Sequence, residues 1–228
     1  MSDPAPNAEL LRSLAKLVRG LAALFWGLPL ALIVCVWTAQ SYRLRTFGFV
    51  PPVVTMGLPL YGLVLLGKFQ PQERVWRTAL DRTQLLAVIN LGLSPFLYWS
   101  TRMPGQPFFT AVVTLLVVTG LVFLSHVNLV LERLSAMLPD ETLRSETKQF
   151  APVNRILLAA SLILIVAYVF FDRAGIVPPV YLDTIISVAE GKILWLVIPF
   201  VLLPLAMTMA LIWKTKEVIL ESVFGARR

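Results

Sequence analysis

Six long apolar stretches, none containing Asp, Glu, Lys or Arg, constrain this chain more than any other feature of its sequence. They cover residues 21–39, 47–67, 85–99, 108–131, 156–171 and 193–213. A helix needs roughly 20 mostly apolar residues to cross a bilayer. The third stretch is short, and we expect it to extend back through Leu80, with Arg82 reaching toward the interface. The pattern predicts an all-α integral membrane protein with six transmembrane helices.

The composition supports this class. Only 14% of the 228 residues are charged, whereas a soluble domain carries about 25%. The net charge of +7 comes from basic residues between the apolar stretches, a pattern that indicates membrane topology rather than a nucleic-acid partner. The single cysteine, Cys35, and the single histidine, His126, exclude an intrachain disulfide, a cysteine-cluster metal site and bis-histidine haem ligation.

The basic residues also predict orientation. Of the 20 Lys and Arg residues, fifteen lie in four segments that would share one side of the membrane, and five lie in the segments between them. Since Lys and Arg accumulate on the cytoplasmic side, we expect both termini inside and three hairpins pointing outward. The first stretch lacks a small-x-small cleavage site, so we expect it to be retained. The compact loops favour a bacterial inner membrane.

Two segments on the predicted cytoplasmic side read as amphipathic helices. Residues 8–20 place Arg12, Lys16 and Arg19 opposite a leucine-rich face, which is typical of a helix lying in the interface. Residues 71–84 form the second, with Glu73 and Arg77 spaced for an ion pair. The inner segment 132–155 is interpreted as a solvated connector that contains a short helix after Pro139, with contact to a cytoplasmic partner as the alternative.

A short sequence motif occurs twice, and we interpret both copies as boundaries between helices. GFVPP at 48–52 and GIVPP at 175–179 each end one element and start the next, because proline lacks an N–H and restricts its neighbour. The segment 172–192 that contains the second copy is expected to form a short amphipathic helix on the outer surface. We treat the chain as one membrane domain, divided into an interfacial helix at 1–20, a bundle at 21–213 and a tail at 214–228.

Three polar side chains inside the stretches are candidates for function: Asn90, His126 and Asn128. His126 as a general base would need an orienting carboxylate and a nucleophile, and no stretch contains an acidic residue. By helical rise, His126 lies about 27 Å inward of Phe108, and Asn90 lies about 13 Å inward of Trp99. We interpret His126 as interfacial and the two amides as hydrogen-bonding groups between helices.

Prolines and small residues give weaker signals. Five prolines interrupt four stretches, and such breaks can line a substrate cavity in transporters, although they are also common in membrane helices generally. These are Pro29, Pro59, Pro95, Pro199 and Pro204. Small residues four apart predict close helix packing, at Ala23–Gly27, Thr110–Thr114 and Ala206–Ala210.

The motifs that mark self-contained chemistry are missing from the sequence. It holds no Walker phosphate loop, no HExxH, no Gly-x-Ser-x-Gly and no paired carboxylates in the apolar stretches. We therefore predict no catalytic, cofactor or metal site and do not expect an enzyme. The leading hypothesis is a structural or accessory subunit, or a scaffold, of a membrane assembly, with the bilayer and other protein subunits as partners.

Two alternatives remain. The first is a permease subunit driven by a separate soluble ATPase. The layout alone resembles the membrane half of an ABC exporter, with an inner helix before the first span, six spans and an inner helix between the second and third. That resemblance implies an ATPase contact at Glu73, Trp76 and Arg77. The second alternative is an intramembrane lipid-modifying enzyme that uses His126.

Overall fold

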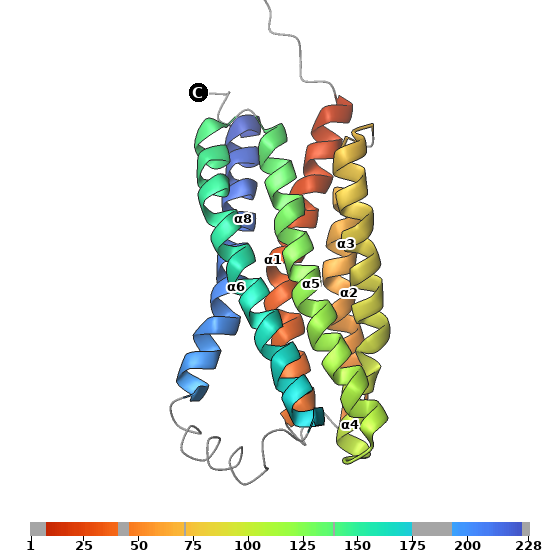
Figure 1. Cartoon of the computed structure of the whole chain (residues 1–228). Helices are drawn as coiled ribbons and strands as arrows, with labels where there is room; N and C mark the ends of the chain where they lie inside the picture. Colours follow the sequence, from red (N-terminus) through yellow and green to blue (C-terminus); the bar gives the residue numbers. More distant parts are fainter. Residues whose placement is uncertain (1–7, 41–45, 71, 139, 175–192, 225–228) are drawn as a thin grey trace, which may run out of the picture.

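The computed structural model describes residues 8–40, 46–70, 72–138, 140–174 and 193–224, and within these ranges it contains helices and no strand. The helices are α1 (Ala8–Gln40), α2 (Val50–Leu66), α3 (Arg74–Leu93), α4 (Pro95–Arg102), α5 (Pro107–Met137), α6 (Glu141–Ala174) and α8 (Ile193–Phe224). They form one elongated bundle (Figure 1). We call the end at which α1 begins and α8 ends the terminal end, and the opposite end, which holds α4, the hairpin end.

The all-helical prediction is confirmed, and the helix lengths support a membrane location. Among the described residues, three helical segments are long and apolar enough to cross a membrane: Arg12–Gln40, Pro107–Met137 and Glu141–Ala167. The apolar helix Val50–Leu66 is shorter. Since a spanning helix needs roughly 20 residues, α1, α5 and α6 each satisfy the requirement by themselves.

The core lies mainly at the terminal end of the bundle. On α1, Leu17, Leu21 and Leu24 recur at helical spacing and have 0% exposure. The residues that pack with them come from α2, α3, α5, α6 and α8, while α4 contributes none. Fully buried members of this core include Leu63, Leu66, Leu131, Leu134, Leu158 and Ile212.

Two glycines bring the backbones of α1 and α2 into contact. A Cβ atom added to Gly62 would lie 2.8 Å from the carbonyl oxygen of Gly20, and one added to Gly20 would lie 2.8 Å from the carbonyl oxygen of Gly62. Further along α1, a Cβ on Gly27 would lie 3.0 Å from the Cδ of Pro59. Small residues at a helix crossing permit such close approach and strengthen van der Waals contact in a membrane.

The helices extend beyond the stretches that predicted them. The segments 8–20, 74–84 and 214–224 belong to α1, α3 and α8 and are not separate interfacial or tail elements. The physical reason is that their apolar side chains pack inside the bundle, as shown by the burial of Leu17, Trp76 and Ile219. The short helix expected after Pro139 is likewise the beginning of the long helix α6.

The start of α6 is capped by Asp140. Its Oδ1 accepts hydrogen bonds from the Thr142 hydroxyl at 2.6 Å and from the backbone N–H groups of Thr142 and Leu143 at 2.8 and 3.0 Å. These satisfy donors that the first turn of a helix leaves open. The Thr142 hydroxyl first, and then the backbone N–H groups, stabilise the carboxylate and lower the pKa of Asp140 below its usual value.

Glycine and proline lie in the described turns where helices begin, as predicted. Gly48 has a φ of +63°, and α2 starts two residues later with prolines in its first turn. Gly105 has a φ of +88°, and α5 starts at Pro107. The third apolar stretch is divided between α3 and α4 at Ser94 and Pro95, and the helix α3 extends back beyond Leu80. The GIVPP phrase and nearly all of 172–192 lie outside the described residues.

Candidate functional site

A buried group of polar side chains joins α5, α6 and α8. It consists of Asn128, Asn154 and Thr208, none more than 2% exposed, and we call it the amide cluster. Asn128 Nδ2 donates to the Thr208 hydroxyl at 3.0 Å, and Asn154 Nδ2 lies 3.1 Å from both Asn128 Oδ1 and Thr208 Oγ1. Each of the three helices therefore supplies one hydrogen-bonding side chain to a common centre.

Backbone carbonyls complete the amide cluster. Asn128 Nδ2 also donates to the carbonyl of Leu124 at 2.9 Å. The Thr208 hydroxyl lies 2.7 Å from the carbonyl of Pro204, which also accepts from Asn154 Nδ2 at 3.3 Å. A Thr side chain returning to the carbonyl four residues earlier is common in helices. The same Pro204 carbonyl, one turn before Thr208, thus links α8 to α6.

One acceptor of the amide cluster is left without a partner. Asn154 Oδ1 is the one buried side-chain nitrogen or oxygen, among the described residues, that makes no hydrogen bond. Rotating the amide would not correct this, because its oxygen would then face Asn128 Oδ1 and the Pro204 carbonyl. An unpaired buried acceptor costs about 1–3 kcal/mol. Asn154 Oδ1 therefore retains an unused hydrogen-bonding capacity.

The amide cluster lies beside the charged part of the bundle. Arg155, next to Asn154, pairs with Glu132 of α5 at 3.4 Å. Further toward the terminal end, Lys214 of α8 pairs with Glu146 of α6. The cluster thus occupies the border between the charged terminal end and the apolar remainder of α5 and α6.

Asn90 belongs to a separate contact. Its Oδ1 accepts a hydrogen bond from the Thr119 hydroxyl at 2.7 Å, and its Nδ2 lies 3.4 Å from the Thr119 carbonyl. This pair joins α3 to α5, whereas Asn128 joins α5 to α6 and α8. The structure therefore does not bring the two predicted asparagines together, although each bonds to a neighbouring helix.

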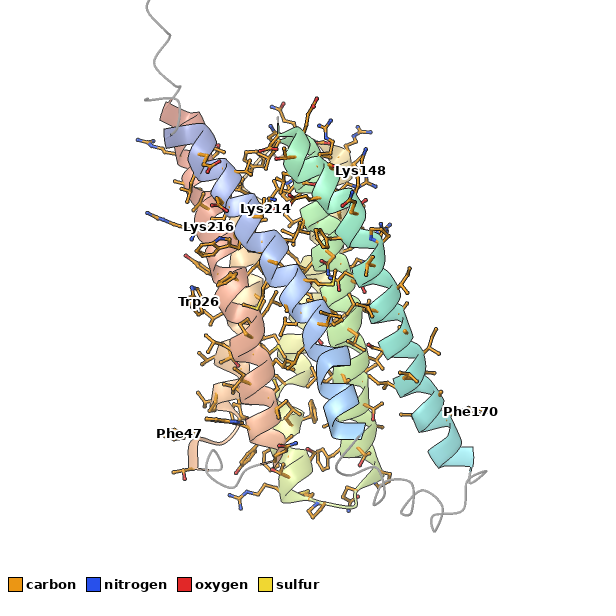
Figure 2. All side chains as sticks on the ribbon, turned by 90° about the vertical axis from the view of Figure 1, so that its left-hand side faces the viewer. Trp26, Phe47, Lys148, Phe170, Lys214 and Lys216 are labelled. Atoms are coloured by element: carbon orange, nitrogen blue, oxygen red, sulfur yellow. The ribbon has the colours of Figure 1, made fainter. Side chains whose placement is uncertain are left out.

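Near the amide cluster, α6 and α8 part. Buried residues recur along one face of α6 at Leu143, Thr147, Asn154, Leu158 and Ser161. From residue 162 to residue 170, no side chain that the structure describes is buried. Figure 1 shows α6 diverging from α8 toward the hairpin end, and Figure 2 labels Phe170 near that end of α6.

His126 does not take part in the amide cluster. Its Nδ1 lies 2.9 Å from the carbonyl of Val122 in its own helix. Within the described ranges, no carboxylate or hydroxyl hydrogen-bonds to its ring, and no group of three His, Cys, Asp or Glu residues can hold a metal ion. Among the described residues, the hydrogen bond of the His126 ring is therefore made within α5 itself.

The structure places the predicted prolines on four different helices. Pro29 and Pro59 lie in α1 and α2 near their crossing, and Pro95 begins α4. Pro199 and Pro204 lie within α8, and only Pro204 contacts the amide cluster. The structure adds a proline that the sequence analysis did not select, Pro152, inside α6 and two residues before Asn154.

The predicted partner contact at residues 73–77 needs correction. Trp76 is 1% exposed, and its Nε1 donates to the Phe69 carbonyl at 3.1 Å, so its side chain is not on a surface that an ATPase could reach. Glu73 and Arg77 are exposed. The expected ion pair between them is not formed, since the structure joins them only through backbone groups.

Two members of the amide cluster escaped the sequence analysis. Asn154 lies in a charged segment that was interpreted as a connector, and Thr208 lies between the small residues Ala206 and Ala210. A usable signal was the spacing of Thr147, Asn154 and Ser161, which repeats every seven residues and places three polar groups on one helix face. Such a polar stripe predicts a helix that faces other helices.

Similarity to known proteins does not assign this site. The chain was compared with protein-family models, with curated proteins and with solved structures, and none of the three comparisons found a match.

Proposed function

We propose that this chain is a six-span protein of a bacterial inner membrane, with both termini cytoplasmic, that serves as a structural or accessory subunit of a membrane assembly. The distribution of Lys and Arg supports the orientation, and the described ends of the chain lie at one end of the bundle. Reporter fusions placed after residue 228 and in the 100–107 turn test it. We expect the fusion after residue 228 to report a cytoplasmic location and the fusion in the 100–107 turn to report an external one.

One observation carries the accessory role. In the hairpin half of α6, Ile163, Leu164 and Val166 are all exposed, and at about 100° per residue they point in different directions around the helix. A helix that is apolar all round is normally covered on all sides, by other protein or by the bilayer. On this proposal, a transmembrane helix of another subunit packs between the diverging halves of α6 and α8, and the chain supplies contacts rather than catalysis.

Site-specific photo-cross-linking tests the accessory role. A photoreactive amino acid at Leu164 is expected to capture a second membrane protein in cells. The matched control is Leu85 of α3, which is equally apolar and exposed and lies on another face of the bundle. Lipid adducts alone from Leu164, or the same protein captured from both positions, would argue against the proposal.

A permease driven by a separate ATPase is the second candidate, and the unpaired Asn154 Oδ1 favours it. Transporters place polar groups at interrupted helices, and the amide that carries this acceptor donates through its Nδ2 to the carbonyl of Pro204 in α8. Glu73 and Arg77 are the exposed positions at which an ATPase would bind. Co-purification of a soluble ATPase that is lost in Glu73→Lys, but kept in the control Glu141→Lys, would make this the leading function.

A further inference from the structure

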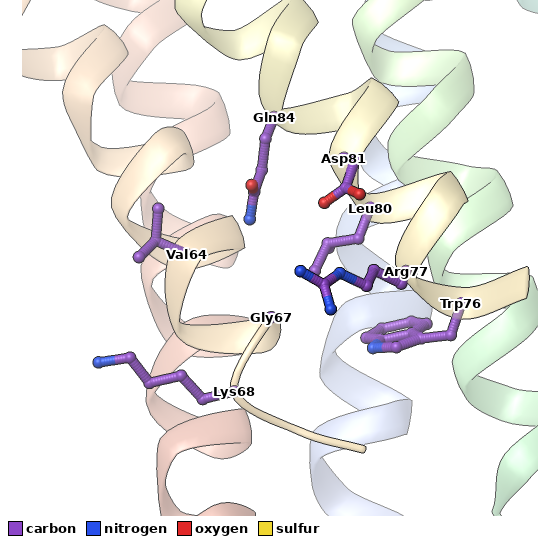
Figure 3. A pocket seen from close by; sticks show the side chains of 8 residues that line it. All are labelled: Val64, Gly67, Lys68, Trp76, Arg77, Leu80, Asp81 and Gln84. Carbon is purple, nitrogen blue, oxygen red and sulfur yellow. The ribbon is translucent and has the colours of Figure 1, made fainter. Parts of the chain in front are cut away.

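A cavity of about 280 Å³ lies between the end of α2 and the beginning of α3, at the terminal end of the bundle (Figure 3). Gly67 forms part of its wall, where a Cβ atom would lie 3.2 Å from Leu80 Cδ2. Below it, Trp76 is buried and anchored to the Phe69 carbonyl. The volume is at the lower limit of ligand pockets, which suits a headgroup rather than a larger molecule.

Unpaired charges of both signs line this cavity. Lys68, Arg77 and Asp81 are exposed, and none of them belongs to either ion pair found among the described residues. Arg77 and Asp81 are four residues apart, but the basic residue comes first, which is the weaker order on a helix. Figure 3 shows both side chains reaching from α3 toward α2.

The cavity also offers a neutral acceptor. Gln84 Nε2 donates to the Leu63 carbonyl of α2 at 3.0 Å, which fixes the amide across the two helices. Its Oε1 is left as a second acceptor on the wall that carries Asp81. The cavity therefore presents cations on one part of its lining and oxygen acceptors on another.

The cavity lies where charged sequence meets apolar sequence on both helices. The apolar run of α2 ends at Gly67, and Lys68 follows. On α3, charged residues continue to Arg82, and the apolar run starts at Leu85. In a membrane helix, this change marks the level of the lipid headgroups.

An exposed apolar surface leads from the cavity toward the hairpin end. Tyr61 of α2 and Leu85 and Val88 of α3 are exposed, and they continue the helix faces that line the cavity. At Gly57 and Gly92, further along the same faces, an added Cβ atom would meet nothing within 4 Å. This surface has the length and character to lie against acyl chains.

We propose that the cavity binds an aminophospholipid through its zwitterionic headgroup. Arg77 and Lys68 hold the phosphate, because guanidinium and ammonium groups form charge-assisted hydrogen bonds to it. The primary ammonium of the headgroup donates to the Asp81 carboxylate and to Gln84 Oε1. The acyl chains lie along the exposed surface between α2 and α3. The site is independent of the accessory role, whereas it shares Arg77 with the ATPase contact of the permease alternative.

Lipid competition tests this site. The full chain is reconstituted in vesicles of equal parts phosphatidylethanolamine, phosphatidylglycerol and phosphatidylcholine, and retained lipids are counted by native mass spectrometry. Phosphatidylethanolamine is expected to be retained about tenfold over phosphatidylcholine, which has the same phosphate but no N–H donor. Equal retention of the three lipids would overturn the proposal. Displacement of the lipid by soluble glycerophosphoethanolamine or inorganic phosphate would overturn it too, by indicating a soluble ligand.

Variants separate the two halves of the headgroup. Asp81→Asn is expected to abolish the preference for phosphatidylethanolamine over phosphatidylcholine while phosphatidylglycerol binding persists. Arg77→Gln is expected to weaken the binding of all three lipids. Glu73→Gln and Arg82→Gln are matched controls, because both positions are exposed on the same segment and neither lines the cavity. An unchanged preference in Asp81→Asn, with the fold intact by circular dichroism, would refute the assignment.

Discussion

The crossing of α1 and α2 predicts opposite effects for two alanine substitutions on the same helix. A Cβ atom at Gly62 would lie 2.8 Å from the Gly20 carbonyl oxygen and 3.2 Å from the backbone nitrogen of Leu24. Because both neighbours are backbone atoms, Gly62→Ala requires the helices to separate. At Gly57 an added Cβ would meet nothing within 4 Å. The two variants therefore differ in packing while sharing the same change in chemistry.

The magnitudes follow from two terms. Replacing glycine by alanine in a helix gains about 1 kcal/mol in either variant. Overpacking a tight contact costs about 1–3 kcal/mol, and this cost falls on Gly62→Ala alone. We expect Gly62→Ala to be about 2 kcal/mol less stable than Gly57→Ala. We expect the stability of Gly57→Ala to equal or exceed that of the parent protein. Gly20→Ala should resemble Gly62→Ala, since it meets the same contact from the other side.

Reversible unfolding in mixed detergent micelles, followed by circular dichroism, measures this difference. The double variant of Gly20 and Gly62 should cost less than the sum of the two single changes, because one separation of the helices relieves both contacts. If Gly62→Ala and Gly57→Ala agree within about 0.5 kcal/mol, the usual range for substitutions at open positions, the close crossing does not exist and the reasoning fails.

Three further predictions concern polar groups. Asn128→Leu should lower the free energy of unfolding by about 1–2 kcal/mol, because it leaves more of the Asn154 amide unpaired. Asn154→Leu should lower it by less, because it also removes the unpaired Oδ1. The reverse order in the same unfolding assay would contradict this prediction. The lowered pKa of Asp140 means that its cap stabilises α6 above the unfolded-state pKa and is lost as pH falls through the folded-state pKa. The protection of backbone amides in the first turn of α6 against hydrogen exchange, taken relative to their intrinsic exchange rates at each pH, should therefore fall in acid, and Asp140→Asn should remove that pH dependence. Glu146→Gln, which breaks a half-exposed pair with Lys214, should cost less than about 1 kcal/mol, a loss that disappears at high salt; a salt-independent loss would mean another role.

The apolar stretches located the helices correctly and their ends poorly. Apolar composition reports where a bilayer must cover a helix, so the stretches fall within α1, α5, α6 and α8. Charged residues report where the bilayer ends, and a helix can continue well past that point when its apolar side chains find protein. Leu17 and Ile219, both fully buried, show why 8–20 and 214–224 continue the neighbouring helices.

The close contacts were harder to predict because each joins distant parts of the chain. The small residues that predicted close packing lie four apart on one span, whereas the observed crossing joins Gly20 and Gly62 from two helices. Asn128 was selected because it stands in an apolar stretch. Its partner Asn154 was not, because a charged segment hides one polar residue among many. Only the packing of α5 against α6 distinguishes a buried amide from an exposed one.

The placement of these contacts separates a fixed part of the bundle from a part that is open to interaction. The amide cluster, the glycine crossing and the apolar core all tie helices together toward the terminal end. Beyond Ser161, α6 has no buried side chain among those described, and α8 diverges from it (Figure 1). On the proposal of an accessory role, a partner helix packs between the hairpin halves of α6 and α8. The cavity between α2 and α3, where we propose that a lipid headgroup binds, lies in the fixed part, so its occupation is independent of that contact.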